Sequence, residues 1–533
     1  MRNAFALAVA LVVLASGGSV HAQTLPSPAT PAPAPAISVD RARAGIPLGT
    51  SLTINVGGTT GPLTVQVPFD GLEATYDPLT RRLTLTGHAA GSGTLTLTDR
   101  AGRTGTIAVL VAPPAGVIPS DIDVVLAGTV SAAFITARIR DALDRALVRQ
   151  PGTGLDVHGL TIPPSLAPGD RFDAQAGVTL DGRGAFVDVS GRMNVHVLVD
   201  PEPPLDPSLL FYSDDPEYVG PQLAGVLFRG TIDVHSPARL FAYHVAAGAP
   251  RRTSLVLRAT AAAHVQILGT SSGASPAFTY IGQQSSARFL AAHASGESAI
   301  LSLAAGVPYE IPFSLQQPGD LIEAIEDVRV LDGGPVDLLL VTRPSDAPLP
   351  PLDGPELPGD DHGRRGAFAI AGVPPLDLTF TSGAPDPAPV SVGDAAPANL
   401  RAGGKPLGGD YGIVRPLSLH LANKTAAPLQ VYLYELTSGT GGATSTLWFN
   451  GENAATLVQC IDDANAPHLV KAFALAAGET RTVSATFMTD GAASYPLRFG
   501  LTATAPLPVP PNGCAPAAPS ASPPPSPSPS PSP

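Results

Sequence analysis

The pentapeptide Gly269-Thr-Ser-Ser-Gly273 is the stretch of the sequence that most directly suggests catalysis, with Ser271 as the nucleophile. In hydrolases that use this pattern, the serine stands on a sharp turn between a strand and a helix, which exposes its hydroxyl. The following Ala274-Ser-Pro276 opens a helix poorly, and a β-rich chain offers no parallel sheet to carry such a turn. We therefore expect no catalytic residue here, and no other part of the sequence shows a catalytic constellation.

Three carboxylates between residues 213 and 218 are of the right type to bind a calcium ion: Asp214, Asp215 and Glu217. Calcium takes about six to eight oxygen ligands from carboxylates and carbonyls. The segment lacks the alternating acidic residues and glycine of a calcium loop, so a solvated acidic turn is the other interpretation. The histidines show no helical i, i+4 pair and no cysteine partner of the kind that zinc sites use. We expect no cofactor.

The single tryptophan, Trp448, stands beside the polar sequence Asn450-Gly-Glu452. An aromatic ring next to polar groups can hold a sugar ring or anchor a partner protein. The same ring can instead fill the edge of a sandwich core. The sequence leaves both interpretations open: a ligand site made of Trp448, Asn450 and Glu452, or a core position.

The two cysteines, Cys460 and Cys514, both lie near the end of the chain. In an oxidising compartment a disulfide between them would close a loop. By lowering the entropy of the unfolded chain, it would stabilise the folded state by roughly 4 kcal/mol. Two free thiols are the alternative. We expect the disulfide, which would tie the C-terminal tail to the last domain.

The N-terminus predicts export. Arg2 precedes an apolar run at residues 4–15, and Val20-His-Ala22 fits a cleavage site, so residues 1–22 form a signal peptide. No later run of about twenty apolar residues predicts a membrane span. We expect a periplasmic, cell-surface or extracellular protein without transmembrane insertion.

Composition favours a β-rich body. Only 14% of the residues are charged, 44% are hydrophobic, and 55 Gly and 59 Pro interrupt long helices. The formal net charge of -13 leaves no basic stripe for nucleic acid. We expect partners among envelope or extracellular proteins or polysaccharides.

Residues 37–114 alternate apolar and polar side chains, as in Leu52, Ile54 and Val56, which predicts short half-buried strands of a β-sandwich. The run from Leu83-Thr-Leu-Thr-Gly87 through residues 93–99 to Thr106-Ile-Ala-Val109 resembles bacterial Ig-like domains and the N-terminal domain of pilus-assembly secretins. The resemblance implies a sandwich here. Nothing downstream is similar to a secretin pore.

Residues 115–205 predict a small α+β module. Its one helix follows a cap at Thr129 or Ser131 and carries an apolar stripe, and Asp141 stands four residues before Arg145. The stripe consists of Ile135, Ile139, Leu143 and Leu147. A strand at 122–126 precedes the helix, and a hairpin with its turn at Ser190-Gly191 follows it.

A pattern written twice organises the rest of the chain. Residues 254–267 recur as residues 418–431, and each copy continues to a Leu-Ala-Ala-Gly turn, at 303–306 and 475–478. A third landmark is Asp332-Gly-Gly-Pro-Val336 in the first copy and Asp490-Gly through Tyr495-Pro-Leu497 in the second. The order of signals resembles adhesion-related Ig-like modules of bacteria, which implies two sandwich copies, at 206–343 and 366–505.

The copies differ in their insertions, where binding sites usually lie. In residues 316–330 of the first copy, a short helix is expected from four apolar positions: Leu321, Ile322, Ile325 and Val328. The second copy is longer around residues 448–460. Pro-rich segments at 23–36, 344–365 and 506–533 read as two linkers and a disordered tail.

Together these patterns predict a mainly β protein: several Ig-like β-sandwich domains in tandem with one small α+β module. The expected role is an exported, non-enzymatic adhesion or scaffolding protein of the cell surface or envelope. A polysaccharide-binding protein is the alternative, and a hydrolase is the second alternative.

Overall fold

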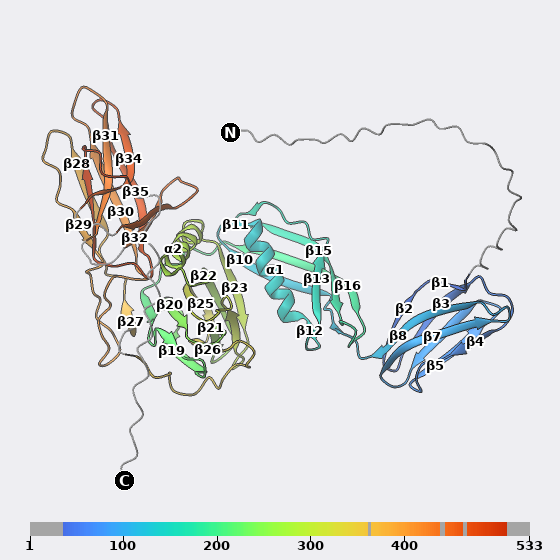
Figure 1. Cartoon of the computed structure of the whole chain (residues 1–533). Helices are drawn as coiled ribbons and strands as arrows, with labels where there is room; N and C mark the ends of the chain where they lie inside the picture. The colour runs from blue at the N-terminus through green and yellow to red at the C-terminus, as the bar shows by residue number, and fades with distance from the viewer. Residues whose placement is uncertain (1–35, 361–363, 438–442, 462–465, 509–533) are drawn as a thin grey trace, which may run out of the picture. The chain divides into compact units, whose positions relative to one another are not determined.

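The computed structural model describes residues 36–360, 364–437, 443–461 and 466–508 (Figure 1). The predicted signal peptide, nearly all of the first linker, Cys514 and the tail beyond residue 508 lie outside these residues. The described chain is mainly β, with two helices and several sheets, as the sequence predicted. It forms two compact units. The first comprises the chain up to residue 117 with 149–155 and 179–189, and the second comprises the remainder.

The first unit contains a two-sheet sandwich, which confirms the β fold expected for residues 37–114. One sheet has the order β1 (Ser38–Val39), β3 (Ser51–Gly57), β6 (Arg82–Gly87) and β5 (Leu72–Asp77). The other has the order β2 (Arg43–Pro47), β8 (Thr104–Ala112), β7 (Gly91–Asp99) and β4 (Leu63–Gln66). Alternation along the strands buries Ile54, Leu83 and Leu95 completely.

The predicted helix is α1 (Ala132–Ala146), and Ser131 caps it. Ile135, Ile139 and Leu143 form its buried stripe, as expected from their spacing. The expected pairing of Asp141 with Arg145 is wrong. Asp141 contacts Arg138 at 2.9 Å, while Arg145 donates to the Glu310 carbonyl at 2.6 Å and stacks 3.6 Å above the Tyr309 ring. Arg145 therefore serves tertiary packing.

The other elements of the module are short strands and two long ones. They are β9 (Gly116–Val117), β10 (Asp121–Ala127), β11 (Val130–Ser131), β12 (Val148–Arg149), β13 (Gly154–His158), β14 (Ser165–Leu166), β15 (Arg171–Asp181) and β16 (Val189–Asp200). The hairpin turn predicted at Ser190-Gly191 is wrong, because both residues lie inside β16. The turn falls at Arg183 and Gly184, whose φ angles of 49° and 77° reverse the chain.

Strand β10 continues into the sheet of the first repeat copy, since Leu126 pairs with Ala299 of β23 (Ser298–Leu303). From β16 and β10 the order runs through β23, β22, β25, β20 and β17 to β27. These strands are β22 (Ala263–Ser275), β25 (Leu321–Gly333), β20 (Ala238–Ala246), β17 (Leu209–Ser213) and β27 (Arg365–Ala369), and β18 (Tyr218–Val219) also pairs with β20. The sheet thus crosses the boundaries expected near residues 205 and 365.

The short helix predicted within residues 316–330 is wrong, because this segment leads into β25. Residues 321–328 of the strand are buried on both faces. A strand covered on both sides needs no alternation of apolar and polar residues. The spacing of its apolar residues therefore imitated a helical stripe.

A four-stranded sheet completes the first copy. Its order is β19 (Gly225–Ile232), β26 (Val336–Pro344), β21 (Arg251–Ala259) and β24 (Tyr309–Pro312). Val256, Leu339 and Val341 share a buried cluster with Leu352. Leu352 belongs to the segment expected to be a linker, and Glu356 of that segment contacts Arg401 at 3.0 Å. The described part of the segment is thus packed against the fold.

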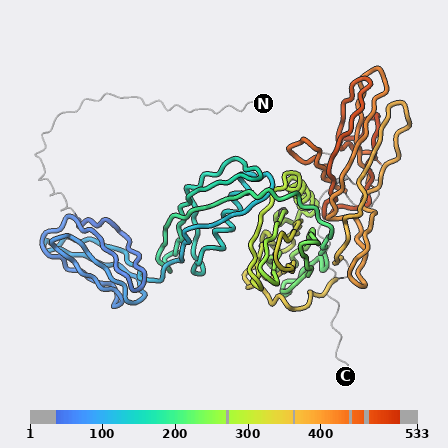
Figure 2. Tube along the Cα trace, turned by 180° about the vertical axis from the view of Figure 1, so that it is seen from behind, coloured from blue at the N-terminus to red at the C-terminus, as the bar shows by residue number. Residues whose placement is uncertain are grey.

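The second copy is a separate two-sheet sandwich, coloured orange to red in Figures 1 and 2. One sheet has the order β28 (Leu376–Thr381), β30 (Val414–Ala422), β35 (Thr480–Thr489), β32 (Ala443–Phe449) and β33 (Thr456–Ile461). The other has the order β29 (Val390–Val392), β36 (Leu497–Thr502), β31 (Leu429–Thr437) and β34 (His468–Leu475). Leu419, Leu433 and Phe487 are completely buried between them.

Strand pairing follows one plan in both copies. β21 pairs with β24 as β30 pairs with β35. β22 pairs with β23 and β25 as β31 pairs with β34 and β36. The Leu-Ala-Ala-Gly turns connect β23 to β24 and β34 to β35, and Gly306 and Gly478 have φ angles of 70° and 71°. The first two landmarks of the repeat therefore occupy equivalent positions.

The third landmark does not. Asp332 lies at the end of β25, whereas Asp490 precedes β36, the strand that pairs as β25 does. The insertions also differ in kind. Between β22 and β23 the chain forms the helix α2 (Phe278–Ser295), whereas between β31 and β34 it forms β32 and β33.

Gly306 and Gly478, the glycines with positive φ in the two Leu-Ala-Ala-Gly turns, allow a test of how much their backbone conformation contributes to stability. Gly306→Ala and Gly478→Ala should each lower the free energy of unfolding by about 1 kcal/mol, because alanine is strained at positive φ. A Cβ at either position meets no atom within 4 Å, so backbone conformation is the whole effect. Denaturant unfolding followed by Trp448 fluorescence measures it.

Gly372→Ala is the matched control, since this turn glycine also has open space but no positive φ. Its change should stay within about 0.5 kcal/mol. Equal losses at all three glycines would contradict a conformational cause.

Candidate functional site

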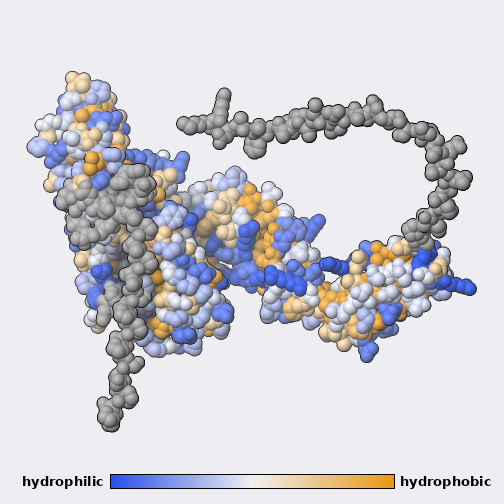
Figure 3. Space-filling model, viewed as in Figure 1, coloured by the Kyte–Doolittle hydropathy of each residue, from blue (hydrophilic) through white to orange (hydrophobic). Residues whose placement is uncertain are grey.

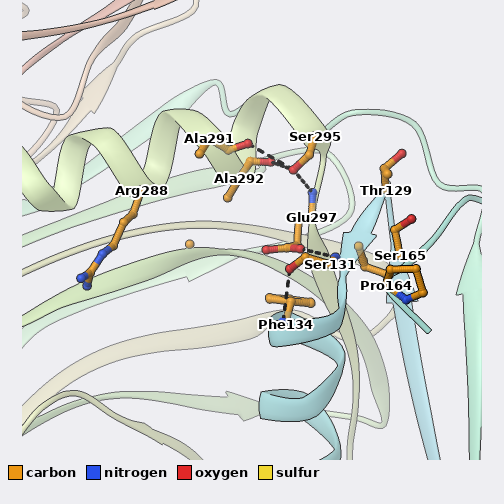
Figure 4. A pocket seen from close by; sticks show the side chains of 12 residues that line it. Thr129, Ser131, Phe134, Pro164, Ser165, Arg288, Ala291, Ala292, Ser295 and Glu297 are labelled. Carbon is orange, nitrogen blue, oxygen red and sulfur yellow. Dashed lines mark hydrogen bonds between the residues drawn. The ribbon is translucent and has the colours of Figure 1, made fainter. Parts of the chain in front are cut away.

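A cavity of about 500 Å³ lies between the start of α1 and the end of α2 (Figure 4). Residues from four separate stretches of the second unit line it: Thr129, Val130, Ser131, Phe134, Pro164, Ser165, Gly269, Arg288, Ala291, Ala292, Ser295 and Glu297. Most of this lining is apolar. The cavity is the candidate binding site of the described chain.

Glu297 and Ser131 fix one end of the cavity. The Ser131 hydroxyl accepts from the Phe134 amide at 3.3 Å, and the Ser131 amide donates to the Glu297 carboxylate at 2.7 Å. A carboxylate at a helix N-terminus is favourable, because the free amides there carry partial positive charge. Glu297 thus positions the first turn of α1 in the cavity wall.

Two glycines set how closely the turn before α1 approaches the end of α2. Gly296 terminates the helix with a φ of 70°, and the Thr129 amide donates to the Ser295 carbonyl at 3.0 Å. A Cβ at Gly128 would lie 2.1 Å from the Gly296 oxygen. The turn before α1 can approach α2 this closely only because Gly128 lacks a side chain, while Gly296 is needed for its positive φ.

The chemistry of the lining suits binding. Figure 4 shows the Arg288 guanidinium pointing away from Glu297. The two opposite charges therefore stand apart, with apolar residues of the cavity lining between them. In Figure 3 apolar surface covers part of the α1 region beside it. The lining contains no histidine, cysteine or lysine. It offers an aromatic ring and hydroxyls to a ligand, but no paired nucleophile and base.

A serine and a histidine that the sequence did not single out form a hydrogen-bonded pair elsewhere. Ser213 Oγ lies 3.1 Å from His244 Nε2, and His244 Nδ1 lies 2.8 Å from the Pro216 carbonyl. The Pro216 carbonyl can only accept, so Nδ1 donates to it and Nε2 accepts from the serine. Burial lowers the pKa of His244 to about 4. Both side chains are fully buried, which closes the pair to substrates.

The acidic turn next to this pair binds the chain itself. Asp214 accepts from the Tyr212 hydroxyl at 3.0 Å and from the Arg364 amide. Asp215 accepts from the Asp360 amide at 2.6 Å and contacts Arg365 at 3.3 Å. Burial raises the pKa of Asp214 to about 6.

The Glu217 amide donates to the Asp360 side chain at 2.9 Å, so Glu217 joins this network through its backbone. Within the described ranges no group of three acidic, histidine or cysteine residues could hold a metal ion. The turn therefore holds Asp360, Arg364 and Arg365 in place.

Ser271 lies in strand β22, where its backbone pairs with Ala324 of β25. A helix does follow: β22 ends at Ser275 and α2 (Phe278–Ser295) begins three residues later, so the expectation that Ala274-Ser-Pro276 opens a helix poorly is wrong. Ser271 itself lies inside the strand and not at the turn, whereas a nucleophile elbow places its serine at the turn. The structure does not describe its side chain.

Trp448 lies in strand β32 and is partly buried against the core cluster that contains Phe289 and Met488. Asn450 is exposed in the following turn, and Glu452 accepts from Lys471 at 2.6 Å. This geometry favours the core interpretation of Trp448.

The backbone of Cys460 lies in β33, but its side chain and the whole of Cys514 are outside the description. The disulfide between them stays a prediction. No helix in the described ranges has the length and apolar character needed to span a bilayer.

No protein-family model matches the chain, and no curated protein matches its sequence. Solved structures share 10% to 12% identity with it. A GH5 endo-beta-1,4-glucanase from Bacillus licheniformis has 10% identity, with 31% of this chain and 38% of that chain covered and a TM-score of 0.14. The human desmocollin-1 ectodomain has 10% identity, 33% and 43% coverage and a TM-score of 0.12.

The Bacteroides ovatus SGBP-B, solved with a mixed-linkage heptasaccharide, has 12% identity, 56% and 70% coverage and a TM-score of 0.13. The chain spans less than half the length of the glucanase and desmocollin structures. TM-scores this low carry no argument about fold or function. The resemblance of the first domain to secretin N-terminal domains stays a prediction.

Proposed function

We propose that the chain is an exported, non-enzymatic protein of the cell surface or envelope with an adhesion or scaffolding role. One observation carries this proposal: side chains of the kind that catalysis uses are committed to holding segments of the fold together. Ser213 and His244 are sealed in the core, and Asp215 holds Arg365. The cavity between α1 and α2 is lined by groups that suit ligand binding.

The leader-like N-terminus and the repeated sandwich plan support the same role. Two repeat copies on one pairing plan give two similar β surfaces, which suits contact with large partners. The net charge of -13 disfavours anionic membranes and nucleic acids as those partners. Proteins or neutral polysaccharides fit better.

Fractionation of the cell that makes the protein tests the location. Antibody should detect the protein in the envelope fraction, and washing at high salt should not release it, because salt screens only exposed charge contacts. Recovery from the cytoplasm would contradict the proposal. Release into the salt wash would contradict a stable adhesive contact.

A hydrolase remains the second alternative, and the buried serine and histidine make it testable. The purified protein should release no nitrophenol from short acyl esters above the uncatalysed rate, since the Ser213 hydroxyl has no exposed surface. Ser213→Ala should behave identically. A burst of product from the wild type that Ser213→Ala loses would establish a catalytic serine.

Polysaccharide binding is the second candidate function. The cavity is a better place for it than the segment around Trp448. The Phe134 ring could support the apolar face of a sugar, while Thr129, Ser165 and Arg288 offer polar groups around it. Trp448, in contrast, packs against a core cluster with its side chain partly buried.

Calorimetry with soluble wall or matrix glycans tests this candidate. If glycans bind in the cavity, Phe134→Ala and Arg288→Ala should each weaken binding about tenfold, which corresponds to one lost aromatic or polar contact. Asn450→Ala, in the turn after Trp448, is the control and should bind as the wild type does. The reverse pattern would place the site at the turn.

A further inference from the structure

Two buried carboxyl groups, Glu323 and Asp490, lie where the last sandwich meets α2 and β25, and a third, Glu435, lies next to Asp490 within the sandwich. Glu323 comes from β25, Asp490 directly follows β35, and Glu435 comes from β31. The exposed fraction of each residue is 0%. Buried carboxylates are normally paired with a cation or saturated with hydrogen bonds. These three depart from that rule.

Their hydrogen bonds are incomplete. No hydrogen bond of normal geometry reaches either carboxyl oxygen of Glu323. Asp490 accepts from Thr446 at 2.7 Å through Oδ1, and no hydrogen bond of normal geometry reaches its Oδ2. Glu435 accepts from Ser445 through Oε2, and its Oε1 has no partner.

No arginine or lysine of the described residues balances them. Asp490 acts on both Glu323 and Glu435, and no arginine, lysine or histidine of the described chain contributes to the pKa of any of the three. The other groups that face them are one histidine, hydroxyls and phenols: His468, which pairs with Glu435 across β31 and β34, and Ser285, Ser286, Thr444, Tyr243, Tyr411 and Tyr495. Ionising these acids would put uncompensated like charges into the contact.

The packing leaves little room to relax. A Cβ on Gly282 of α2 would lie 2.0 Å from the Gly491 carbonyl oxygen, and one on Gly491 would lie 1.7 Å from Glu323 Oε2. Gln283 of α2 donates to the Val458 carbonyl of β33 at 2.8 Å. The Glu323 carboxyl thus lies against the backbone of the last sandwich.

We propose that this contact is an acid-stabilised clamp: it holds α2 against the last sandwich while Glu323, Asp490 and Glu435 keep their protons, and proton loss releases it. A protonated carboxyl is a neutral donor, which suits the hydroxyls of Ser285 and Ser286 beside it. The clamp makes the attachment of the second repeat copy depend on pH.

The sign of the pH dependence follows from burial. Burial raises the pKa of Asp490 to about 6 and of Glu435 to about 8, and it raises the pKa of Glu323 well above its ordinary value. Unfolded carboxyls titrate near about pH 4. The stabilisation is therefore complete below about pH 4 and is lost as the pH rises through the folded pKa values.

Hydrogen exchange of α2 and β32, measured by mass spectrometry on the full chain between about pH 5 and pH 9, tests the clamp. After correction for the intrinsic exchange rate, the opening equilibrium should rise with pH, by up to about tenfold per pH unit for each ionising group. The variant Glu323→Gln with Asp490→Asn keeps the shapes and removes both protons. Its opening should depend much less on pH.

Glu326→Gln is the matched control. Glu326 is another buried acid of β25, its pKa is raised to about 8 by burial, and the charges acting on it are those of Arg138 and Asp327 rather than the last sandwich. It should leave the pH dependence at α2 as in the wild type. If the double variant does not fold, Glu323→Gln and Asp490→Asn are measured singly.

Two results would overturn the proposal. One is a pH dependence of opening that is the same in the wild type and in the carboxyl variants. The other is opening at constant low pH on addition of a chelator, reversed by calcium, because the carboxyls would then hold a cation in place of protons.

Discussion

A buried ion pair between Arg239 of β20 and Asp327 of β25 holds four segments of the second unit together. Arg239 Nε and Nη2 donate to the two Asp327 oxygens at 2.6 and 2.9 Å, and Nη1 donates to the Gly412 carbonyl at 3.0 Å. The guanidinium also lies 4.8 Å from the ring centre of Phe289 on α2. One side chain therefore links two strands, a helix and the segment that leads into the last sandwich.

A buried pair of this kind specifies geometry more than it adds stability, because desolvation offsets much of its attraction. The guanidinium has a fixed planar fork, so only one placement of β25 and Gly412 satisfies it. The same strand also carries Glu323, four residues before Asp327. Unlike Asp327, Glu323 has no cationic partner. β25 thus fixes the position of α2 at one point and makes that position depend on protonation at another.

The sequence predicted those elements whose burial differs between their two faces. Alternation found the strands of residues 37–114, and a narrow apolar stripe found α1. The alternation of apolar and polar residues failed to predict β25, because a strand that is buried on both faces does not alternate. It also missed α2, whose buried face includes Gly282, Gln283, Ser285 and Ser286 and therefore has no apolar stripe.

The candidate site could not be predicted for a different reason. Its lining combines residues 129–134, 164–165, 269 and 288–297, which only the tertiary fold brings together. Ser213 and His244 are likewise joined by the parallel pairing of β17 with β20. Local sequence carries no trace of such contacts. Trp448 carried a local signal, its rarity, but that signal does not distinguish an exposed ring from a packed one.

The repeat explains why a polar helix and a polar sheet face each other. α2 is the insertion of the first copy, and β32 and β33 are the insertion of the second, at equivalent points of one pairing plan. The two insertions contact each other, through Gln283 and Val458 and around Asp490. If α2 were apolar, β32 would have to be apolar as well. Each would then expose a hydrophobic surface until the two repeat copies had packed together during folding. Serine, threonine and protonated carboxyls avoid that exposure, so the segments that distinguish the copies are also the ones that join them.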